Sequence, residues 1–286
     1  MNISCEWNDY TCIASGDGEK LEKWGNYILR RPDPQIIWPK TDKNLWDNWD
    51  GFYHRSNKGG GYWEFKKKLP DSWTIKYKNL KFKVSPTNFK HTGIFPEQAT
   101  NWDFVANQIK NSGRKDFRVL NLFAYTGCAT ISASAAGASE VVHVDSSKGM
   151  IEWAKENRDL SGIHDNYIRY IIDDVMKFLA REKRRGRTYH GIIMDPPSYG
   201  RGPNGEVWKL EDNLGELLKK AKDVLDDDYS FLLINSYTTG ISPTSLNNIL
   251  SLIFNGDNIV TGEIGLPVKE NNLVLPCGIY GKVTKN

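Results

Sequence analysis

Three acidic side chains, Asp145, Asp174 and Asp195, lie at the ends of short apolar runs of the sequence. The runs cover residues 141–144, 167–172 and 191–194 and predict buried parallel strands. Because the carboxyl ends of parallel strands meet at one edge of a sheet, we expect the three carboxylates to share a site. Clustered carboxylates attract a cation and repel phosphate, so the predicted ligand is positively charged and free of phosphate groups.

The turn before these runs, Asn121-Leu122-Phe123-Ala124-Tyr125-Thr126-Gly127, leads from another predicted strand into a helix that begins near Cys128. Such a turn places backbone N–H groups below a nucleoside. It holds only one glycine of the Gly-x-Gly-x-x-Gly pattern, so a pyrophosphate would meet side chains here. A nicotinamide-dependent dehydrogenase is therefore disfavoured, and S-adenosylmethionine fits better. The candidate cofactor-binding residues of the turn are Asn121, Phe123, Ala124, Tyr125, Thr126 and Gly127.

Further cofactor contacts are predicted at the next strand ends. Asp145, with Ser146 beside it, can accept hydrogen bonds from both ribose hydroxyls; the alternative is that Asp145 caps the following helix. Asp174, in preference to Asp173, can accept from the adenine amino group, although a helix cap or a solvated loop explains it nearly as well. Asp195 completes an acidic edge that would face the sulfonium and amino groups of the cofactor.

The segment Asp195-Pro196-Pro197-Ser198-Tyr199 follows the fourth strand of the predicted sheet. Two consecutive prolines fix a rigid extended loop, which suits methyl transfer because that reaction depends mainly on in-line alignment. For an amine substrate, Asp195 and the Pro196 carbonyl can accept N–H bonds while Tyr199 stacks on a base. The alternative is a stiff turn without chemistry, and residues 199–209 beyond it are predicted to form a flexible lid. The candidate catalytic residues are Asp195, Pro196, Pro197 and Tyr199.

The elements that must position these residues alternate between short apolar runs and longer helical stretches after Ser85-Pro86. Strands are predicted at Arg118–Phe123, Val141–Val144, Tyr167–Ile172, Gly191–Met194, Phe231–Asn235, Ile259–Leu266 and Leu273–Lys282, with helices at Asn101–Ser112, Cys128–Ala136, Lys148–Leu160, Val175–Lys183, Leu210–Leu225 and Ser245–Phe254. The last two strands are joined by a link too short for a parallel crossover, so they are predicted to be antiparallel. The fold class is therefore α/β, with a Rossmann-like seven-stranded sheet and an antiparallel last strand.

A small β-rich domain over residues 1–86 is predicted to precede a catalytic domain over residues 87–286. The first region holds seven of the ten tryptophans and short alternating runs, for example 26–30, 61–66, 73–78 and 80–84. The basic tract Lys66–Lys90, which spans the end of this region, carries interleaved aromatic residues, namely Trp73, Tyr77, Phe82 and Phe89. Either these rings stack on bases, or the strands have one wet and one buried face. A second basic cluster at residues 177–187 is interpreted as a solvated helix end.

The segments 121–127, 144–145, 173–175 and 195–199 together resemble the class I S-adenosylmethionine-dependent methyltransferases. More narrowly, they are similar to the bacterial large-subunit rRNA methyltransferases that modify cytosine C5 or guanine N2. The segment Lys90–Gln98 resembles the Thr-Gly-x-Phe-x-Asp-Gln stretch at the entrance to their cofactor pocket, which implies cofactor contacts for Phe95 and Gln98. The resemblance covers roughly residues 88–282, and the region before it fits the accessory domain of that group.

Two departures from the resemblance bear on the target atom. Cytosine-C5 enzymes need a cysteine after the fifth strand, where this chain has Asn235-Ser236-Tyr237-Thr238-Thr239 without a thiol. Cys277 stays open as a nucleophile, although a cysteine in a strand is more often a small buried residue. Amine methylases usually place the stacking aromatic directly after the second proline, whereas Ser198 precedes Tyr199 here.

Composition describes an ordinary globular chain, with 39% hydrophobic residues and a net charge of +3. No apolar run is long enough to span a bilayer, and the four cysteines lack metal-ligand spacing, so we expect a cytoplasmic protein without a membrane or a metal. Ribosomal RNA is the expected substrate. The alternatives are a methyltransferase of a protein or small molecule, and a noncatalytic RNA-binding or assembly protein that retains the nucleoside pocket.

Overall fold

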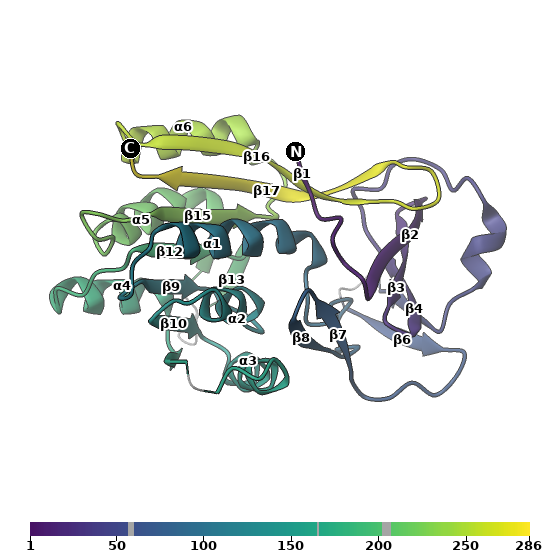
Figure 1. The fold of residues 1–286 in the computed structure, drawn as a ribbon. Helices are drawn as coiled ribbons and strands as arrows, with labels where there is room; N and C mark the ends of the chain where they lie inside the picture. The colour runs from purple at the N-terminus through teal and green to yellow at the C-terminus, as the bar shows by residue number, and fades with distance from the viewer. Residues whose placement is uncertain (57–59, 165, 202–206) are drawn as a thin grey trace. The chain divides into compact units, whose positions relative to one another are not determined.

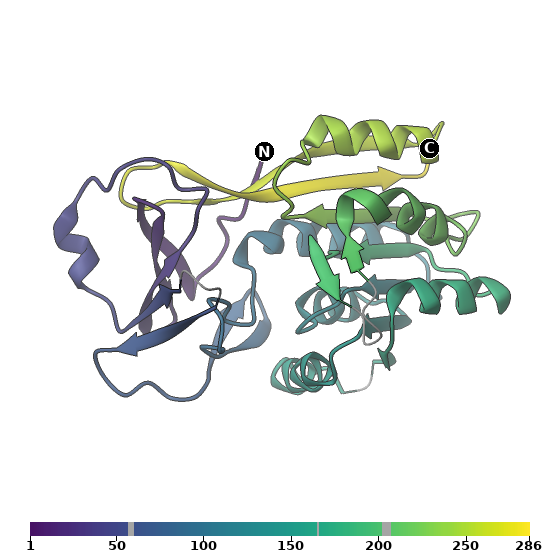
Figure 2. The same cartoon turned by 180° about the vertical axis from the view of Figure 1, so that it is seen from behind.

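The computed structural model describes the whole chain except residues 57–59, 165 and 202–206. Its contacts divide the chain into two units, Met1–Thr100 with Ile264–Cys277, and Asn101–Glu263 with Gly278–Asn286. We call these unit 1 and unit 2. Figure 1 and Figure 2 show the elements of each unit from opposite sides.

The core of unit 2 is built on a twisted sheet in the strand order β1-β16-β17-β15-β12-β9-β10-β11. The sequence predicted seven of these strands and missed the short edge strand β1 (Asn2–Ile3). The other strands are β9 (Arg118–Leu122), β10 (Glu140–Asp145), β11 (Ile168–Ile172), β12 (Gly191–Met194), β15 (Phe231–Ser236), β16 (Asn258–Pro267) and β17 (Val274–Thr284). The central strands are parallel, whereas β17 runs antiparallel to β15. The predicted Rossmann-like sheet with a reversed last strand is confirmed.

Six helices flank this sheet: α1 (Ala99–Asn111), α2 (Cys128–Ala135), α3 (Lys148–Leu160), α4 (Val175–Arg184), α5 (Leu210–Lys222) and α6 (Pro243–Ile253). The apolar sides of α4, α5 and α6 pack on one sheet face, while α1, α2 and α3 lie on the other (Figures 1 and 2). In α5 the buried residues recur at helical spacing, at Leu210, Leu214, Leu217 and Ala221. Burial of both sheet faces explains why the central strands read as continuous apolar runs.

Unit 1 contains a five-stranded sheet in the order β2-β3-β4-β5-β6 and a two-stranded hairpin, β7-β8. The bounds are β2 (Tyr10–Gly16), β3 (Glu19–Trp24), β4 (Tyr27–Pro32), β5 (Gly51–Arg55), β6 (Gly61–Phe65), β7 (Trp73–Tyr77) and β8 (Leu80–Val84), with 3-10 helices η1 (Lys43–Asp47) and η2 (Pro96–Gln98). The predicted N-terminal β-rich region is present. In β7 and β8, Tyr77 and Phe82 are buried while Lys76 and Lys81 are exposed. This hairpin therefore has one solvent-exposed and one buried face, which was the second of the two interpretations of the basic tract.

The division into units differs from the predicted boundary at residue 86. Residues 264–277 belong to unit 1 because β1 (Asn2–Ile3) pairs with the end of β16, Asn2 opposite Ile264. Lys269 N also donates to Cys12 O at 3.0 Å. Pairing between opposite ends of the chain leaves no local pattern in the sequence. The assignment of residues 264–277 to unit 1 could therefore not be predicted from composition.

A buried ion pair holds the sheet of unit 1 together. Glu22 accepts from Arg31 Nε and Nη2 at 2.6 and 2.9 Å and from the Tyr10 hydroxyl at 2.7 Å. Burial opposes ionisation of Glu22, but Arg31 and Lys20 outweigh it and lower the pKa of this carboxyl to about 2. Arg31 Nη1 also donates to the Lys90 carbonyl at 2.8 Å, so the pair fixes the start of the segment 90–98.

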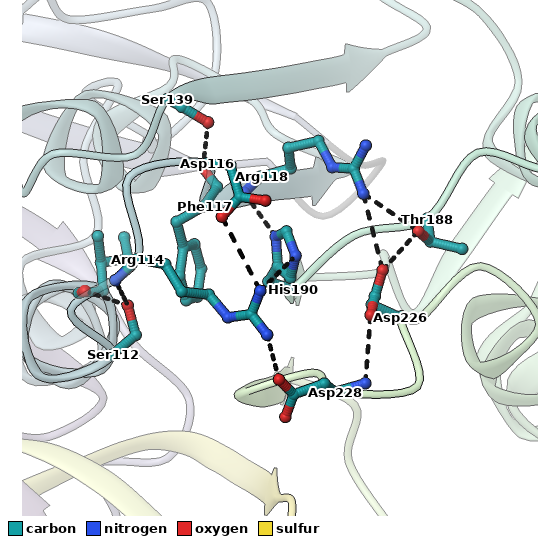
Figure 3. A network of polar contacts seen from close by, with 11 residues as sticks. Ser112, Arg114, Asp116, Phe117, Arg118, Ser139, Thr188, His190, Asp226 and Asp228 are labelled. Atoms are coloured by element: carbon teal, nitrogen blue, oxygen red, sulfur yellow. Dashed lines mark hydrogen bonds and ion pairs between the residues drawn. The ribbon is translucent and has the colours of Figure 1, made fainter.

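A polar network fixes the beginnings of β9 and β12 in unit 2 (Figure 3). His190 Nδ1 accepts from Arg118 N at 3.0 Å, and Arg118 Nη2 donates to Thr188 Oγ1 at 3.2 Å. Thr188 in turn donates to Asp226 at 2.7 Å. Arg118 is the first residue of β9, and the other residues precede β12 or β15. The network therefore lies at the amino edge of the sheet, opposite the edge where the predicted site residues follow the strands. We interpret it as a structural support.

Candidate functional site

Backbone register brings the predicted site segments to one edge of the sheet. Leu122, the last residue of β9, pairs with Val144 of β10 and with Met194 of β12. Asp145 pairs with Ile172, the last residue of β11. The turn after β9, Asp145 itself, the Asp173-Asp174 pair and the double-proline loop therefore follow adjacent strand ends, as the sequence predicted.

The turn between β9 and α2 has an unusual backbone. Phe123, Tyr125 and Gly127 have φ values of 54°, 50° and 81°, in the left-handed region that residues other than glycine seldom adopt. The turn closes through bonds from Ala124 N to Val144 O and from Gly127 N to Ala124 O, each 3.0 Å. Strained turns of this kind persist where the surroundings over-determine them, which is typical of ligand sites.

Gly127 is required at this turn for space as well as for conformation. A Cβ atom at this position would lie 2.8 Å from the Ala154 Cβ of α3. We expect Gly127→Ala to lower the free energy of unfolding by about 2 kcal/mol and to weaken S-adenosylhomocysteine binding, since both strain and overpacking result. Urea unfolding and calorimetric titration measure the two effects.

Gly137→Ala is the matched control, because Gly137 has a φ of 103° but nothing within 4 Å of a built Cβ. It adds backbone strain alone and is expected to cost less than Gly127→Ala. In the double variant Gly127→Ala with Ala154→Gly, the Ala154 Cβ that would be too close is removed, so part of the stability lost in Gly127→Ala should be recovered. Equal losses in the two alanine variants would show that the α3 contact is unimportant.

Asp145 connects the two turns that border the predicted ribose position. Its Oδ2 accepts from Tyr125 N at 2.9 Å, and its Oδ1 accepts from Ser147 N at 2.8 Å. The pKa of this carboxyl is raised above its ordinary value, because the effect of burial exceeds the lowering effect of the two backbone N–H bonds. The N-cap of α3 is Ser147, which accepts from Met150 N, so the alternative that Asp145 caps the helix is wrong. Each carboxylate oxygen keeps a further lone pair for a hydroxyl donor.

A buried hydrogen-bond chain that the sequence pattern does not reveal supports the turn from below. Asn121 Nδ2 donates to Thr130 Oγ1 at 2.9 Å, and Thr130 Oγ1 lies 2.9 Å from His143 Nδ1. Asn121 and His143 pair across β9 and β10, a relation that spacing along the chain cannot indicate. The direct cofactor contact of Asn121 stays a prediction.

His143 should make the stability of the protein depend on pH. Burial lowers its pKa from an ordinary value of 6.5 to about 3. Between these values the unfolded chain binds a proton that the folded chain does not, so stability falls as the pH falls. We expect the free energy of unfolding to drop by about 2 kcal/mol from pH 7 to pH 5 through this residue, as measured by urea unfolding at each pH.

The variant His143→Gln should lose this share of the pH dependence, whatever its stability at pH 7. His91 serves as the matched control, because burial also lowers its pKa, to about 4, and it belongs to unit 1. His91→Gln should leave the His143 share in place. An unchanged pH dependence in His143→Gln would refute the assignment.

The carboxylates after β11 are partly committed to local structure. Asp174 is the N-cap of α4, with Oδ1 accepting from Lys177 N at 2.9 Å. Asp173 accepts from Asp174 N at 2.8 Å and forms an ion pair with Arg181. The helix-cap alternative for Asp174 is therefore observed. Its Oδ2 can still serve the adenine amino group, and that contact stays a prediction.

The double-proline loop is held by side chains from two later segments. Trp208 Nε1 donates to the Pro197 carbonyl at 2.7 Å, and Thr238 Oγ1 donates to Ser198 Oγ at 2.7 Å. The Trp208 ring also lies 5.7 Å from the ring of Phe123, which brings the loop beside the turn after β9. Neither Trp208 nor Thr238 was predicted to hold the loop, because their contacts depend on the fold.

The residues beyond the prolines, which were predicted to form a flexible lid, include two short strands. β13 (Tyr199–Arg201) and β14 (Val207–Lys209) pair as antiparallel strands, with Tyr199 opposite Lys209. Residues 202–206 of the predicted lid lie outside the described part of the chain. Tyr199 is 50% exposed at the start of the hairpin, next to the rigid loop. Asp195 is half-buried and Pro196 is buried.

Phe95 and Gln98 belong to unit 1, where they form the start and the end of the η2 turn. Phe95 is the N-cap residue of η2, and its carbonyl accepts from Gln98 N at 3.0 Å. The Trp7 indole donates to the Pro96 carbonyl at 2.9 Å and so fixes the turn. The cofactor contacts predicted for Phe95 and Gln98 stay predictions.

Cys277 has the environment of a structural residue. It is 6% exposed, and its Sγ lies 3.5 Å from the Leu275 carbonyl. Burial raises the pKa of this thiol well above its ordinary value, which opposes formation of a nucleophilic thiolate.

Among the described residues, no group of three or more His, Cys, Asp or Glu side chains could hold a metal ion. In the same part of the chain, no helix is long and apolar enough to cross a membrane.

Three features together define a class I methyltransferase fold. They are a Rossmann-like sheet with a reversed last strand, carboxylates at adjacent strand ends, and a turn that lacks the glycines of dinucleotide-binding proteins. Comparison with known proteins agrees. The family model described as S-adenosylmethionine-dependent methyltransferase matches residues 53–243. The chain belongs to this family, and S-adenosylmethionine is its cofactor.

Solved structures show the same fold. A methyltransferase described as S-adenosylmethionine-dependent from Agrobacterium tumefaciens is 36% identical, with a TM-score of 0.94 over 100% of this chain and 93% of its own. A putative methyltransferase solved with S-adenosylhomocysteine, SMU.776, is 17% identical with a TM-score of 0.77 over 98% of this chain and 76% of its own, and supports the fold alone.

Curated relatives carry ribosomal names. Ribosomal RNA large subunit methyltransferase K of Neisseria meningitidis is 30% identical over 74% of this chain. Ribosomal RNA large subunit methyltransferase K/L of Shewanella frigidimarina is 32% identical over 54% of this chain. The matches span 61% and 21% of the lengths of these two relatives.

Proposed function

We propose that this chain transfers a methyl group from S-adenosylmethionine to a nucleobase of ribosomal RNA. The observation that carries the proposal is the convergence of the β9 turn, Asp145 and the double-proline loop at adjacent strand ends of one sheet. The ribosomal names of the curated relatives support RNA as the substrate. The buried thiol of Cys277 favours an amine over a cytosine carbon as the methyl acceptor.

The residues around Asp145 supply the cofactor site in this proposal. Asp145 accepts from the ribose hydroxyls, and its bonds to Tyr125 N and Ser147 N keep the carboxylate in place before the ligand arrives. Asp174 Oδ2 accepts from the adenine amino group. The acidic edge complements the sulfonium and ammonium charges. S-adenosylmethionine itself supplies an activated methyl group with a neutral leaving group.

The double-proline loop would align the acceptor amine. Asp195 and the Pro196 carbonyl accept its N–H bonds, so the nitrogen lone pair is directed at the methyl carbon. A carbon–nitrogen bond forms as the carbon–sulfur bond breaks, the electron pair stays on sulfur, and the amine proton passes to solvent. Tyr199 stacks on the target base. Trp208 and Thr238 keep the loop in this geometry through their hydrogen bonds to Pro197 and Ser198.

Mass spectrometry of ribosomal RNA nucleosides from cells with and without the gene tests the proposal. A methylated nucleoside should disappear without the gene, return with the wild-type gene, and stay absent with Asp195→Ala. Titration with S-adenosylhomocysteine and with NAD, in parallel, checks the pocket. Unchanged RNA nucleosides together with methylation of a protein or small molecule would replace the RNA assignment, and failure to bind S-adenosylhomocysteine would favour the noncatalytic alternative.

A further inference from the structure

One face of the five-stranded sheet of unit 1 carries a continuous row of planar side chains. Arg30 of β4 lies 4.1 Å above the Phe52 ring, and Phe52 lies 3.9 Å from the ring of His54, both on β5. His54 stacks on Tyr62 of β6, with ring centroids 4.9 Å apart and an interplanar angle of 18°. The row thus crosses three adjacent strands and ends on β6, the last strand of the sheet.

The Arg30–Phe52 end of the row contacts Trp46 of η1 and Trp49, since the Arg30 guanidinium lies 5.6 Å from the Trp46 ring and the Phe52 ring lies 5.7 Å from the Trp49 ring. The His54–Tyr62 end continues the row beyond these contacts. Trp46 and Trp49 also pack with Leu21 and neighbouring apolar side chains. Strand pairing places Phe52 opposite Glu64 and His54 opposite Tyr62, so these four residues share the adjoining part of the face. Tyr62 is 64% exposed although it stacks on His54. The apolar ring area at this end of the row faces solvent.

Basic side chains border the row. Arg55 is the last residue of β5, and Lys66, Lys67 and Lys68 follow β6, all exposed. Lys66 Nζ lies 4.3 Å above the Trp49 ring, so the cation stays beside the aromatic surface. Acidic groups are present as well: Glu64 accepts from His54 at 2.7 Å, and Lys67 pairs with Asp50 at 2.7 Å.

We infer that this face, comprising Arg30, Phe52, His54 and Tyr62, binds single-stranded RNA by stacking unpaired bases on Tyr62. Planar aromatic and guanidinium groups stack on exposed bases, and flanking cations contact the phosphates. The charged groups interrupting the row make it a poor apolar surface for a protein partner, since docking would bury them. The inference rests on the proposed RNA substrate and names the part of the chain that holds it.

Fluorescence anisotropy with a labelled single-stranded RNA, without cofactor, tests the inference. Tyr62→Ala should bind about 10 to 100 times more weakly than wild type, because loss of stacking on one base costs that much. Tyr62→Phe keeps the ring and should bind within about twofold of wild type. Replacing Arg55 and Lys68 with glutamine should reduce the salt dependence of binding, by about 0.7 in log–log slope for each phosphate that a removed cation had neutralised.

Tyr167→Ala is the matched control, because Tyr167 is a tyrosine of similar exposure, 60%, in unit 2. It should leave RNA affinity unchanged, and S-adenosylhomocysteine binding should be unchanged in every Tyr62 variant. If wild type binds RNA and Tyr62→Ala binds equally well, the inference is wrong and a protein partner becomes the better occupant. If Tyr62→Ala weakens RNA binding but wild type methylates no RNA, the surface stands and the proposed function fails.

Discussion

Replacement of Asp145 by alanine should raise the Kd for S-adenosylhomocysteine about a hundredfold. In the proposed complex the carboxylate makes charge-assisted bonds to the ribose hydroxyls, each contributing about 1.5–3 kcal/mol, and about 1.4 kcal/mol corresponds to a factor of ten. The change also releases Tyr125 N and Ser147 N, which Asp145 now holds at 2.9 and 2.8 Å. Isothermal titration calorimetry measures the affinity.

Two variants separate loss of ribose binding from loss of the turn. Asp145→Asn should bind S-adenosylhomocysteine almost as weakly as Asp145→Ala. Both carboxylate oxygens accept from backbone N–H groups, and the NH₂ group of an asparagine would face one of these donors without accepting from it. Glu152→Gln, on the exposed face of α3, should bind normally and serves as the control. Retained affinity in Asp145→Ala, with circular dichroism showing intact folding, would remove Asp145 from the cofactor site.

Replacement of Glu22 by glutamine should lower the free energy of unfolding of unit 1 by about 3–5 kcal/mol. The reason is that Arg31, 5% exposed, would keep its charge in the interior without the carboxylate that now accepts two of its hydrogen bonds. Seven tryptophans precede residue 85, so tryptophan fluorescence in urea mainly follows unit 1.

The double variant Glu22→Leu with Arg31→Met is the informative partner of this experiment. Removing both charges should restore much of the stability, since apolar residues often replace buried ion pairs without loss. Loss of the exposed Lys155–Glu152 pair through Glu152→Gln should change stability by less than about 1 kcal/mol. If Glu22→Gln costs no more than this surface variant, the pair is not a determinant of unit 1.

The central sheet and its helices could be predicted from the sequence because their signals are local. The runs that became β9, β12 and β15 are mostly apolar, as expected for strands buried on both faces, and the spacing of Leu210, Leu214 and Leu217 sets the buried face of α5. The reversal of β17 followed from a link too short for a crossover. These features depend on periodicity, burial and loop length, each readable along the chain.

The supports of the site depended on contacts between distant residues. His143 meets Asn121 only because β10 pairs with β9, Thr238 reaches Ser198 from another strand end, and Asn2 pairs with Ile264 across the length of the chain. Local patterns along the chain were enough to predict the fold class and the strand ends where the chemistry would lie. The side chains that hold the turn, the double-proline loop and the buried Glu22–Arg31 pair became apparent only in the folded protein, because partners far apart in sequence have no fixed spacing along the chain.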